Sequence, residues 1–483
     1  MLVRKDTVSG HFKIHRFGGL AGFASSGETT VTRVSSRALV MLLLIVFSAV
    51  VAGGQGSYPR ELNLEKAIEI ALDNDPRTKV AESKIKIAEL KKKEAITGKR
   101  PFVQFTQSVT RSNNPAFVFS SLLEQGRFRS SNFELNSIND PKGLFNFRSQ
   151  VGAQVPLFDQ RQTRARIDQA DIGRRRAELD AEGTRQHLRF EVIRGYYGSI
   201  LGQEMLKVRR EALRAAEANR KKAKDMADVG MTTEADLFAA EVEVANAGQQ
   251  KLESESELAV TIVELNLLLG NEPNFEFYIA GDLQEKYFPL EDQEALIRTA
   301  FQNRPDYLAA ELGIQNRQRQ MKAVKDLQLP RIDAFGNIGY SSPYLAKGST
   351  DHSVGVSMTY TLFDPGRKAR FAQAAEATIE AGAEKEVLAN QIRLEVVRAF
   401  QNYITARAKI VVSIKSISQA DDALRIVQDR YKSGLTTFNE VIRAEAALVR
   451  SKQTLQTARH GYYIGYASVL LATGRLNDAR LFD

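Results

Sequence analysis

The sequence predicts a mainly helical fold with long antiparallel coiled helices and a membrane β-barrel portion, to which each chain contributes four transmembrane strands. Three observations predict this fold. A helical hydrophobic period continues far beyond the length of an ordinary helix, four short segments alternate apolar and polar residues, and the whole pattern occurs twice. Because self-similarity of this kind indicates an internal duplication, we expect one elongated unit rather than several separate domains.

The longest periodic segment runs from Arg367 to about Tyr431 and contains no proline. Its apolar residues recur at steps of three and four, which is the spacing of one helix face. At about 1.5 Å per residue, ~65 residues form a rod of about 100 Å, which is too long for a compact domain. Charged residues such as Glu384, Lys385 and Arg393 lie along it and exclude a lipid-embedded helix. We therefore expect coiled packing in water.

Landmarks of this segment recur earlier in the chain at a nearly constant distance. Gly230 and Gly434 are 204 residues apart, and so are Gly270 and Gly474. Leu-Phe-Asp at 157–159 also recurs, at 362–364. Landmarks upstream of residue 101 are spaced more widely, which indicates an insertion of roughly 25 residues in the first copy.

These landmarks define the expected domain organisation. The two structural repeats are residues 53–270 and 292–474, joined by an equatorial connector at 271–291 and followed by a tail at 475–483. Each repeat is expected to contain a helix, a β-hairpin (101–158 and 331–363), a long helix, a tip (229–237 and 432–441) and a shorter helix. Pro76 should begin a helix in the first repeat, whereas the second repeat is expected to begin with one continuous helix, Asp292 to Leu327.

Residues 1–52 are interpreted as an N-terminal extension and signal peptide. Arg33 and Arg37 precede an apolar run at 38–52, and small residues follow it. This is the pattern of a secretory signal, and the run is short for a membrane span. A retained N-terminal anchor is the alternative.

Composition excludes several function classes. The chain has no Cys, so thiolate metal sites, a thiol nucleophile, disulfides and an acylated Cys are all excluded. The net charge is +9, but charges of both signs are mixed and no basic-aromatic cluster appears, which argues against nucleic-acid binding. No HExxH, P-loop, GxSxG or dinucleotide fingerprint is present, so we expect no enzyme activity, cofactor or metal.

The two predicted hairpins have the period of two expected for strands. Val151 and Val155 alternate with Gln150 and Gln154, and residues 354–362 alternate around Ser357 in the same way. Segments of this length with one apolar face suit transmembrane β-strands. A half-buried soluble hairpin would show the same alternation, but secretion and the long rods favour the membrane. Val151, Val155, Val356 and Tyr360 are expected to face lipid.

Four strands cannot close a barrel, and an open sheet edge is not tolerated in lipid. Copies of the chain must therefore complete the barrel, which predicts a cyclic homo-oligomer. The first hairpin loop, about 111–144, is long and rich in phenylalanine, including Phe117, Phe119 and Phe128. We expect a partly ordered lid or contact surface at the outer face, and a self-packed loop without a role is the alternative.

This order of elements resembles the TolC family of outer membrane efflux proteins over about Leu62 to Gly474. The specific signals are the paired Leu-Phe-Asp junctions and the two Gly-Xaa-Thr-Thr tips. The resemblance implies a homotrimer with a twelve-stranded β-barrel in outer membrane lipid and a twelve-helix α-barrel in the periplasm. It further implies export of drugs, metals or proteins together with a periplasmic adaptor (membrane fusion) protein and an inner-membrane pump.

The resemblance also implies roles for the two tips. The adaptor-docking residues would be Val229, Gly230, Thr233, Asp236, Ser433, Gly434 and Thr437, and the periplasmic gate would comprise Tyr431, Asp236, Glu440 and Arg443. Tyr431 would hold the channel shut by bonding Asp236. Thr436 stands where the family's latch has an arginine, and Arg443 stands where its constricting ring has a second acid. Plain turn chemistry, with glycine at a helix end, is the alternative for each tip residue.

Two functional classes follow. The first is a passive conduit of a tripartite efflux or type I secretion system. The second is a secreted periplasmic coiled-coil adaptor or structural tether, which would have no use for four alternating segments at the far end of the rods.

Overall fold

The computed structural model describes residues 61–284, 286–344 and 347–477, all within the unit Arg60–Asp483. The predicted signal peptide at 1–52 and the end of the predicted tail lie outside these residues. Within the described part of the chain, no helix combines the length and the apolar character needed to cross a membrane.

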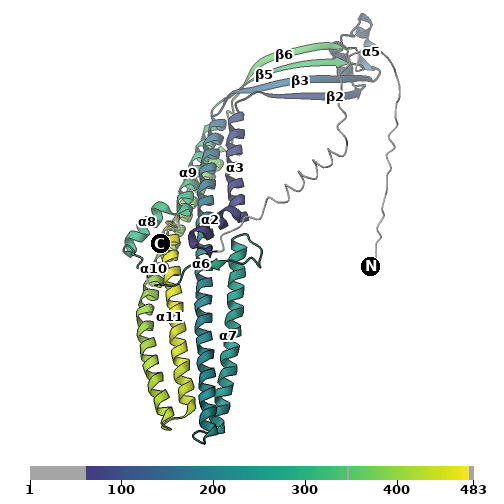
Figure 1. Ribbon diagram of the computed structural model, residues 1–483. Coiled ribbons are helices and arrows are strands. Elements are labelled where there is room, and N and C mark those ends of the chain that lie inside the picture. The colour runs from purple at the N-terminus through teal and green to yellow at the C-terminus, as the bar shows by residue number, and fades with distance from the viewer. Residues whose placement is uncertain (1–60, 285, 345–346, 478–483) are drawn as a thin grey trace, which may run out of the picture. The chain divides into compact units, whose positions relative to one another are not determined.

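Two long helical hairpins form the main body of the unit (Figure 1). Helix α6, Gln162–Asp228, has 67 residues and turns back into α7, Glu234–Leu268, which has 35. Helix α10, Arg367–Lys432, has 66 residues and turns back into α11, Phe438–Ala472, which has 35. Their lengths follow from uninterrupted periodicity without proline, and α10 fills the segment for which a rod is predicted. Helix α11 also packs against α6, so the two hairpins are joined side by side.

Shorter helices pack along the halves of α6 and α10 that lie nearest the sheet (Figure 1). Helices α2, Leu64–Asn74, and α3, Pro76–Thr97, precede the first hairpin of strands, and α8, Gln293–Asn303, and α9, Pro305–Asp326, precede the second. The prediction of one continuous helix from Asp292 to Leu327 is therefore wrong. Arg304 is extended at the break (φ −67°, ψ 121°), because a residue before proline avoids the helical region, and Pro305 then begins α9.

Four antiparallel strands form one sheet in the order β2-β3-β5-β6. They are β2 (Phe102–Ser112), β3 (Leu144–Asp159), β5 (Arg331–Ser342) and β6 (Ser349–Thr359). Strand β6 ends earlier than the predicted hairpin boundary at 363, so Tyr360 lies beyond it and is not a strand residue. A bulge between Pro156 and Phe158 shifts the register where β3 approaches α6.

The register separates an apolar from a polar face, because directly paired residues share a face. Val151 lies opposite Phe105 and Ile338, whereas Gln150 lies opposite Thr106 and Gly339. The apolar face consists mainly of Val103, Phe105, Val109, Phe147, Val151, Ala153, Val155, Ala334, Ile338, Val354 and Val356. The polar face holds mainly Gln104, Thr106, Ser108, Asn146, Arg148, Gln150, Gln154, Asn337, Ser341, Asp351 and Ser353.

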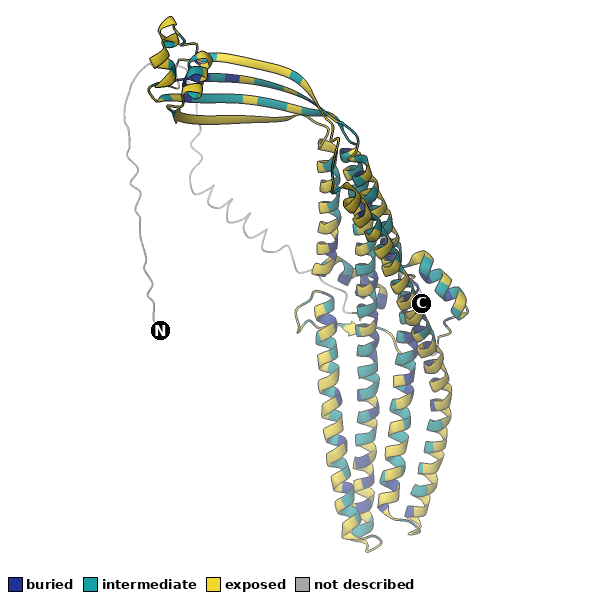
Figure 2. Ribbon diagram, turned by 180° about the vertical axis from the view of Figure 1, so that it is seen from behind, coloured by how far each residue is buried: buried dark blue, intermediate teal, exposed yellow. Residues whose placement is uncertain are grey.

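The main buried core lies at mid-height, where the connector crosses the hairpins (Figure 2). Phe288 stacks on Tyr466 with ring centroids 4.4 Å apart, and the Tyr403 hydroxyl donates to the Phe288 carbonyl. Strand β4, Tyr278–Ile279, pairs in parallel with β1, Glu61–Leu62. Tyr403 and Tyr466 belong to α10 and α11, so this aromatic packing fixes the connector to the second hairpin. The Tyr196 hydroxyl of α6 donates to the Ala280 carbonyl and joins the connector to the first hairpin.

Candidate functional site

Each tip is built from a helix end, a left-handed glycine and a new helix start. Gly230 has φ +76° and Gly434 has φ +70°. Met231 N–H donates to Met226 O at 2.8 Å, and Leu435 N–H donates to Arg430 O at 2.9 Å, which closes each C-terminus with the bonds of a Schellman motif. A Cβ at either glycine would meet no atom within 4 Å, so the backbone angle alone requires glycine.

The outermost tip residues present apolar side chains to solvent. Val229 is 68% exposed, and Met231 and Leu435 are exposed to a similar extent. Thr233 is the N-cap of α7 and accepts a bond from Asp236 N at 3.3 Å, whereas Thr437 caps α11 without a side-chain bond. Ser433 is an exposed C-cap whose hydroxyl donates to Asp429 O at 3.0 Å. The docking residues expected from the sequence therefore occupy the two turns and their caps.

Beneath the turns, Tyr431 joins the two hairpins. It is buried together with Ala223, Ala240, Phe438 and Val441, from both hairpins, and its ring lies 5.5 Å from that of Phe438. This cluster fixes the relative positions of the tips through apolar burial rather than through charge.

The direct bond from Tyr431 to Asp236 that the resemblance implies is replaced by a relay. The Thr232 hydroxyl donates to Asp236 Oδ2 at 2.6 Å and lies 3.4 Å from the Tyr431 hydroxyl. Thr232 thus stands between the two expected latch residues. Sequence reasoning missed it, although it is the first threonine of the Gly-Xaa-Thr-Thr pattern, and Thr436 is its counterpart in the other tip.

Glu440 and Arg443 form an ion pair on one face of α11. Arg443 Nη1 lies 3.0 Å from Glu440 Oε1, and both side chains are at least half exposed. Such an exposed pair contributes under ~1 kcal/mol. The local electrostatics at this level is therefore of mixed sign, with one carboxylate and one guanidinium per chain.

A second polar group that the sequence did not reveal lies above the Tyr431 cluster. Glu445 of α11 accepts from the Asn219 amide of α6 and, at 3.5 Å, from Gln428 of α10. Burial raises the pKa of Glu445, and it also raises the pKa of Glu243 on α7. Both carboxylates line a cavity of about 390 Å³ between the two hairpins. No periodicity marks these residues, because they become neighbours only when the hairpins pack.

No metal centre is formed by the described residues, since none of their His, Asp and Glu side chains gather in groups of three or more that could hold an ion. The arrangement at the tips is one of packing, turn geometry and weak polar contacts.

Comparison with known proteins decides the family. A family model described as "Outer membrane efflux protein" matches residues 67–271 and 296–475, which is well over half of the chain. The chain belongs to the outer membrane efflux protein family. The membership expected from the repeat, the strand pattern and the tips is thereby confirmed.

Relatives and solved structures agree with this membership. The outer membrane efflux protein BepC of Brucella suis is 21% identical over 73% of this chain and 78% of its own length. The outer membrane protein TolC of Escherichia coli is 23% identical over 39% of this chain and 41% of its own length. The CmeC outer membrane channel of Campylobacter jejuni superposes with a TM-score of 0.71 at 17% identity, covering 85% of each chain. Membership of this family supports an outer membrane location and a role as an efflux channel.

Proposed function

We propose that this chain is the subunit of a homotrimeric outer membrane channel, a passive conduit of a tripartite efflux or type I secretion system. Substrates would pass from an inner-membrane pump, through a periplasmic adaptor, into the channel. The observation that carries the proposal is the four-stranded sheet with one apolar face, one polar face and two free edges.

The sheet requires partners. Strands β2 and β6 form its edges, and neither edge pairs with another described strand. On the apolar face, Val354 is 87% exposed, and Val356 and Ile338 are 66% and 65% exposed. An apolar face of this kind suits lipid, where every edge group must find a backbone partner. Three copies would give a closed barrel of twelve strands, with the polar face inward.

The helices support the same assembly. Each chain supplies four long helices in two hairpins of matching size. The longer helices of the two hairpins have 67 and 66 residues, and the shorter helices have 35 residues each. Three copies would place twelve helices around one axis as an α-barrel with internal pseudo-symmetry, extending into the periplasm. Long helices that are exposed in one chain would then pack against the neighbouring chain.

The tips supply the surface for the adaptor. Their exposed apolar residues stand at the end of the rods farthest from the sheet along α6 and α10. A secreted coiled-coil adaptor or structural tether, the competing function, would have no use for an exposed apolar sheet at the opposite end.

Fractionation of the native protein tests the proposal. We expect it in the outer membrane fraction, extracted only by detergent, as a trimer that dissociates on heating. Cross-linking through cysteines introduced into the edge strands β2 and β6 should connect neighbouring chains. A soluble monomer released with the periplasm would overturn the proposal and favour the tether.

A further inference from the structure

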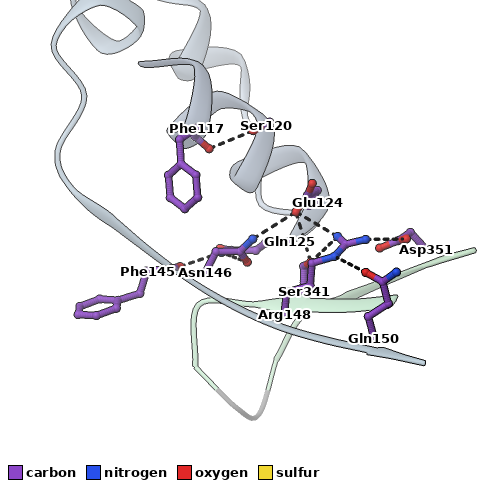
Figure 3. Close-up of polar contacts among 10 residues, drawn as sticks. All are labelled: Phe117, Ser120, Glu124, Gln125, Phe145, Asn146, Arg148, Gln150, Ser341 and Asp351. Atoms are coloured by element: carbon purple, nitrogen blue, oxygen red, sulfur yellow. Dashed lines mark hydrogen bonds and ion pairs between the residues drawn. The ribbon is translucent and has the colours of Figure 1, made fainter. Parts of the chain in front are cut away.

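The long loop between β2 and β3 packs against one face of the sheet at the end farthest from the long helices (Figure 1). It contains α4 (Pro115–Glu124), a 3₁₀ turn η1 (Ser130–Phe133) and α5 (Leu135–Asn139). Val118, Ser121 and Gln125 form its buried stripe, at helical spacing. Helix α4 contacts β3, β5 and β6 (Figure 3). Its sheet partners Asn146, Arg148 and Ser341 all belong to the polar face.

Glu124, at the end of α4, is the centre of this contact. Its Oε2 accepts from Asn146 Nδ2 at 3.2 Å and from Ser341 Oγ at 3.4 Å, and it lies 3.3 Å from Arg148 Nη1. The adjacent Gln125 donates to Phe145 O at 2.9 Å and to Asn146 Oδ1 at 3.0 Å. One helix end is thereby bound to both central strands.

Arg148 extends the contact across the sheet. It donates to Ser341 Oγ and Asp351 Oδ1, both at 3.1 Å, and to Gln150 Oε1 at 3.3 Å. We call Glu124, Arg148, Asp351, Asn146 and Ser341 the outer latch. The Arg148 side chain is 27% exposed and those of Glu124 and Asp351 are under half exposed, so water can still compete for these bonds. A network of this kind holds its parts together yet opens at moderate cost.

The loop can move as one body because it has a small core of its own. Phe128 lies between Phe119 and Phe133, with ring centroids 4.8 and 5.1 Å apart. Residues of α4, η1 and α5 also surround a shared cavity of about 430 Å³. Gly126, with φ +65°, lies two residues beyond the end of α4, and the Arg127 N–H donates to Leu122 O at 2.9 Å, which closes this helix within the loop itself.

We propose that α4 is an outer gate of the channel, held shut by the outer latch. The inference rests on the proposed function, because the polar face becomes the lumen only in a closed barrel. Barrels of eight strands are filled by side chains and those of sixteen to eighteen leave an aqueous channel, so twelve strands enclose a bore of intermediate width. Three helices, each about 10 Å across with side chains, would occupy most of such a bore. Cargo can pass only when α4 leaves the polar face.

Single cysteines provide the test, since the chain has none of its own. Thr106→Cys places a thiol on the polar face, opposite Gln150. This position is two residues closer to the long helices than Ser108, which pairs with Arg148 of the outer latch. Val354→Cys places a thiol on the apolar face. In intact cells, a small water-soluble maleimide added outside should label Thr106→Cys and spare Val354→Cys. The reverse pattern would overturn the barrel orientation, and with it both the proposed function and the gate.

The gate itself is tested by Glu124→Gln in the Thr106→Cys background. This change removes the charge held by Arg148 and keeps the side-chain shape. A bulky maleimide-polyethylene glycol should then label the thiol at least about fivefold faster, because charge-assisted bonds contribute most to the latch. Glu134→Gln, at an exposed carboxylate of the same loop, should leave the rate unchanged. Equal rates in Glu124→Gln and its parent, with trimers intact, would overturn the gate and leave the proposed function standing.

An engineered disulfide that holds the loop on β6 provides the converse test of the gate. A Cβ at Gly126 would lie 3.4 Å from Ser349 Cβ, close to the ~3.5–4.5 Å of disulfides, so Gly126→Cys with Ser349→Cys should lock the loop to β6. When this pair is oxidised, the faster labelling caused by Glu124→Gln should return to the parental rate, and prior reduction should restore it. Fast labelling that persists in the oxidised protein would show that the bulky reagent does not need movement of α4.

Discussion

Thr232 shows how a single hydroxyl can replace a direct contact between two expected partners. Its bond to Asp236 is short, at 2.6 Å, while its contact with the Tyr431 hydroxyl is long, at 3.4 Å. The Tyr431 ring is held by apolar packing in any case. Thr232 and Asp236 both belong to the first tip, so their short bond stabilises that turn, whereas the polar contact of this relay between the two hairpins is the long one from Thr232 to Tyr431.

This difference leads to the first prediction. Thr232→Val keeps the shape and removes both contacts, leaving Asp236 without its hydroxyl donor, at a cost of about 1 kcal/mol. Tyr431→Phe removes only the weaker contact and should cost less. In planar bilayers we expect more frequent opening for Thr232→Val than for Tyr431→Phe. Thr436→Val, at the matching position of the other tip, is the control and should resemble wild type. Equal opening in all three variants would exclude a latch at Thr232.

Glu445 provides a prediction on pH dependence. Burial raises its pKa, so the folded state holds a proton more tightly than the unfolded chain does. Stability should therefore fall as pH rises from the unfolded-state pKa through the raised folded-state pKa, and the carboxylate remains unfavourable at neutral pH. Glu445→Gln keeps an acceptor for Asn219 and Gln428 without the charge.

We expect Glu445→Gln to raise the Tm of detergent-solubilised protein at neutral pH by a few degrees, as ~1 kcal/mol shifts a large domain by about 2–4 °C. The difference from wild type should shrink as pH falls and Glu445 becomes protonated. Thermal unfolding followed by circular dichroism measures both. Glu241→Gln, at an exposed carboxylate of α7, should show no such trend. A stabilisation that is the same at every pH would mean that ionisation of Glu445 is not its cause.

At the scale of elements, the sequence was informative wherever one pattern persisted. The proline-free period beginning at Arg367 predicts α10 to within a residue at its end, because many turns repeat the same signal. The break before Pro305 was missed, although the same rule was applied correctly at Pro76. Alternation past Thr359 suggested a longer strand, but pairing rather than pattern decides where β6 stops.

The helices of the outer loop and the contacts of the outer latch could not be predicted from the sequence, for a physical reason. Helices α4 and α5 are too short to repeat a hydrophobic period, and short helices depend on tertiary contacts. Arg148 looks like any polar residue of an alternating strand until register places it beside Ser341 and α4 folds back over both. The abundance of phenylalanine led to the expectation of a partly ordered lid or contact surface at the outer face, but it did not identify α4 or the residues that α4 contacts.

The two faces of β6 provide the prediction at this scale. Val356 and Ser357 are neighbours in sequence and lie on opposite faces, paired with Ala334 and Asp333. Val356→Arg should cost about 2–4 kcal/mol if the residue is near the membrane midplane, and Ser357→Arg should be tolerated because its face would line the interior of the proposed barrel. The yield of heat-modifiable trimers in membranes measures the difference. Equal loss of trimers in both variants would contradict the face assignment.

At the scale of the whole molecule, the two candidate gates are joined by continuous helices. Helix α6 begins just after β3 ends at Asp159 and reaches the tip at Asp228, and its 67 residues span about 100 Å at ~1.5 Å each. The sequence predicted this arrangement because length and order follow from local pattern. Contacts that lie between elements, such as Glu445 with Asn219, depend on packing that no local pattern encodes.

Arg443 gives the last prediction, which concerns the assembled channel. In a trimer, Glu440 and Arg443 would each recur three times, and the structure pairs them within one chain at 3.0 Å. If their shared face lines the bore, the narrow end has mixed charge, and its weak pairs should make conductance sensitive to salt through screening. Arg443→Asp should convert this level into an acidic ring, raise cation selectivity and introduce block by multivalent cations from the periplasmic side.

Single-channel recordings in planar bilayers measure selectivity and block for this variant. Arg425→Asp is the matched control, because it breaks an equally exposed pair, with Asp422 at 3.2 Å, on α10. It changes the net charge of the chain by the same amount, so a general electrostatic effect would appear in both variants. Block that appears in Arg443→Asp alone locates the charge in the pore. Unchanged selectivity and block in Arg443→Asp would place this side chain outside the bore and remove the mixed-charge account of the gate.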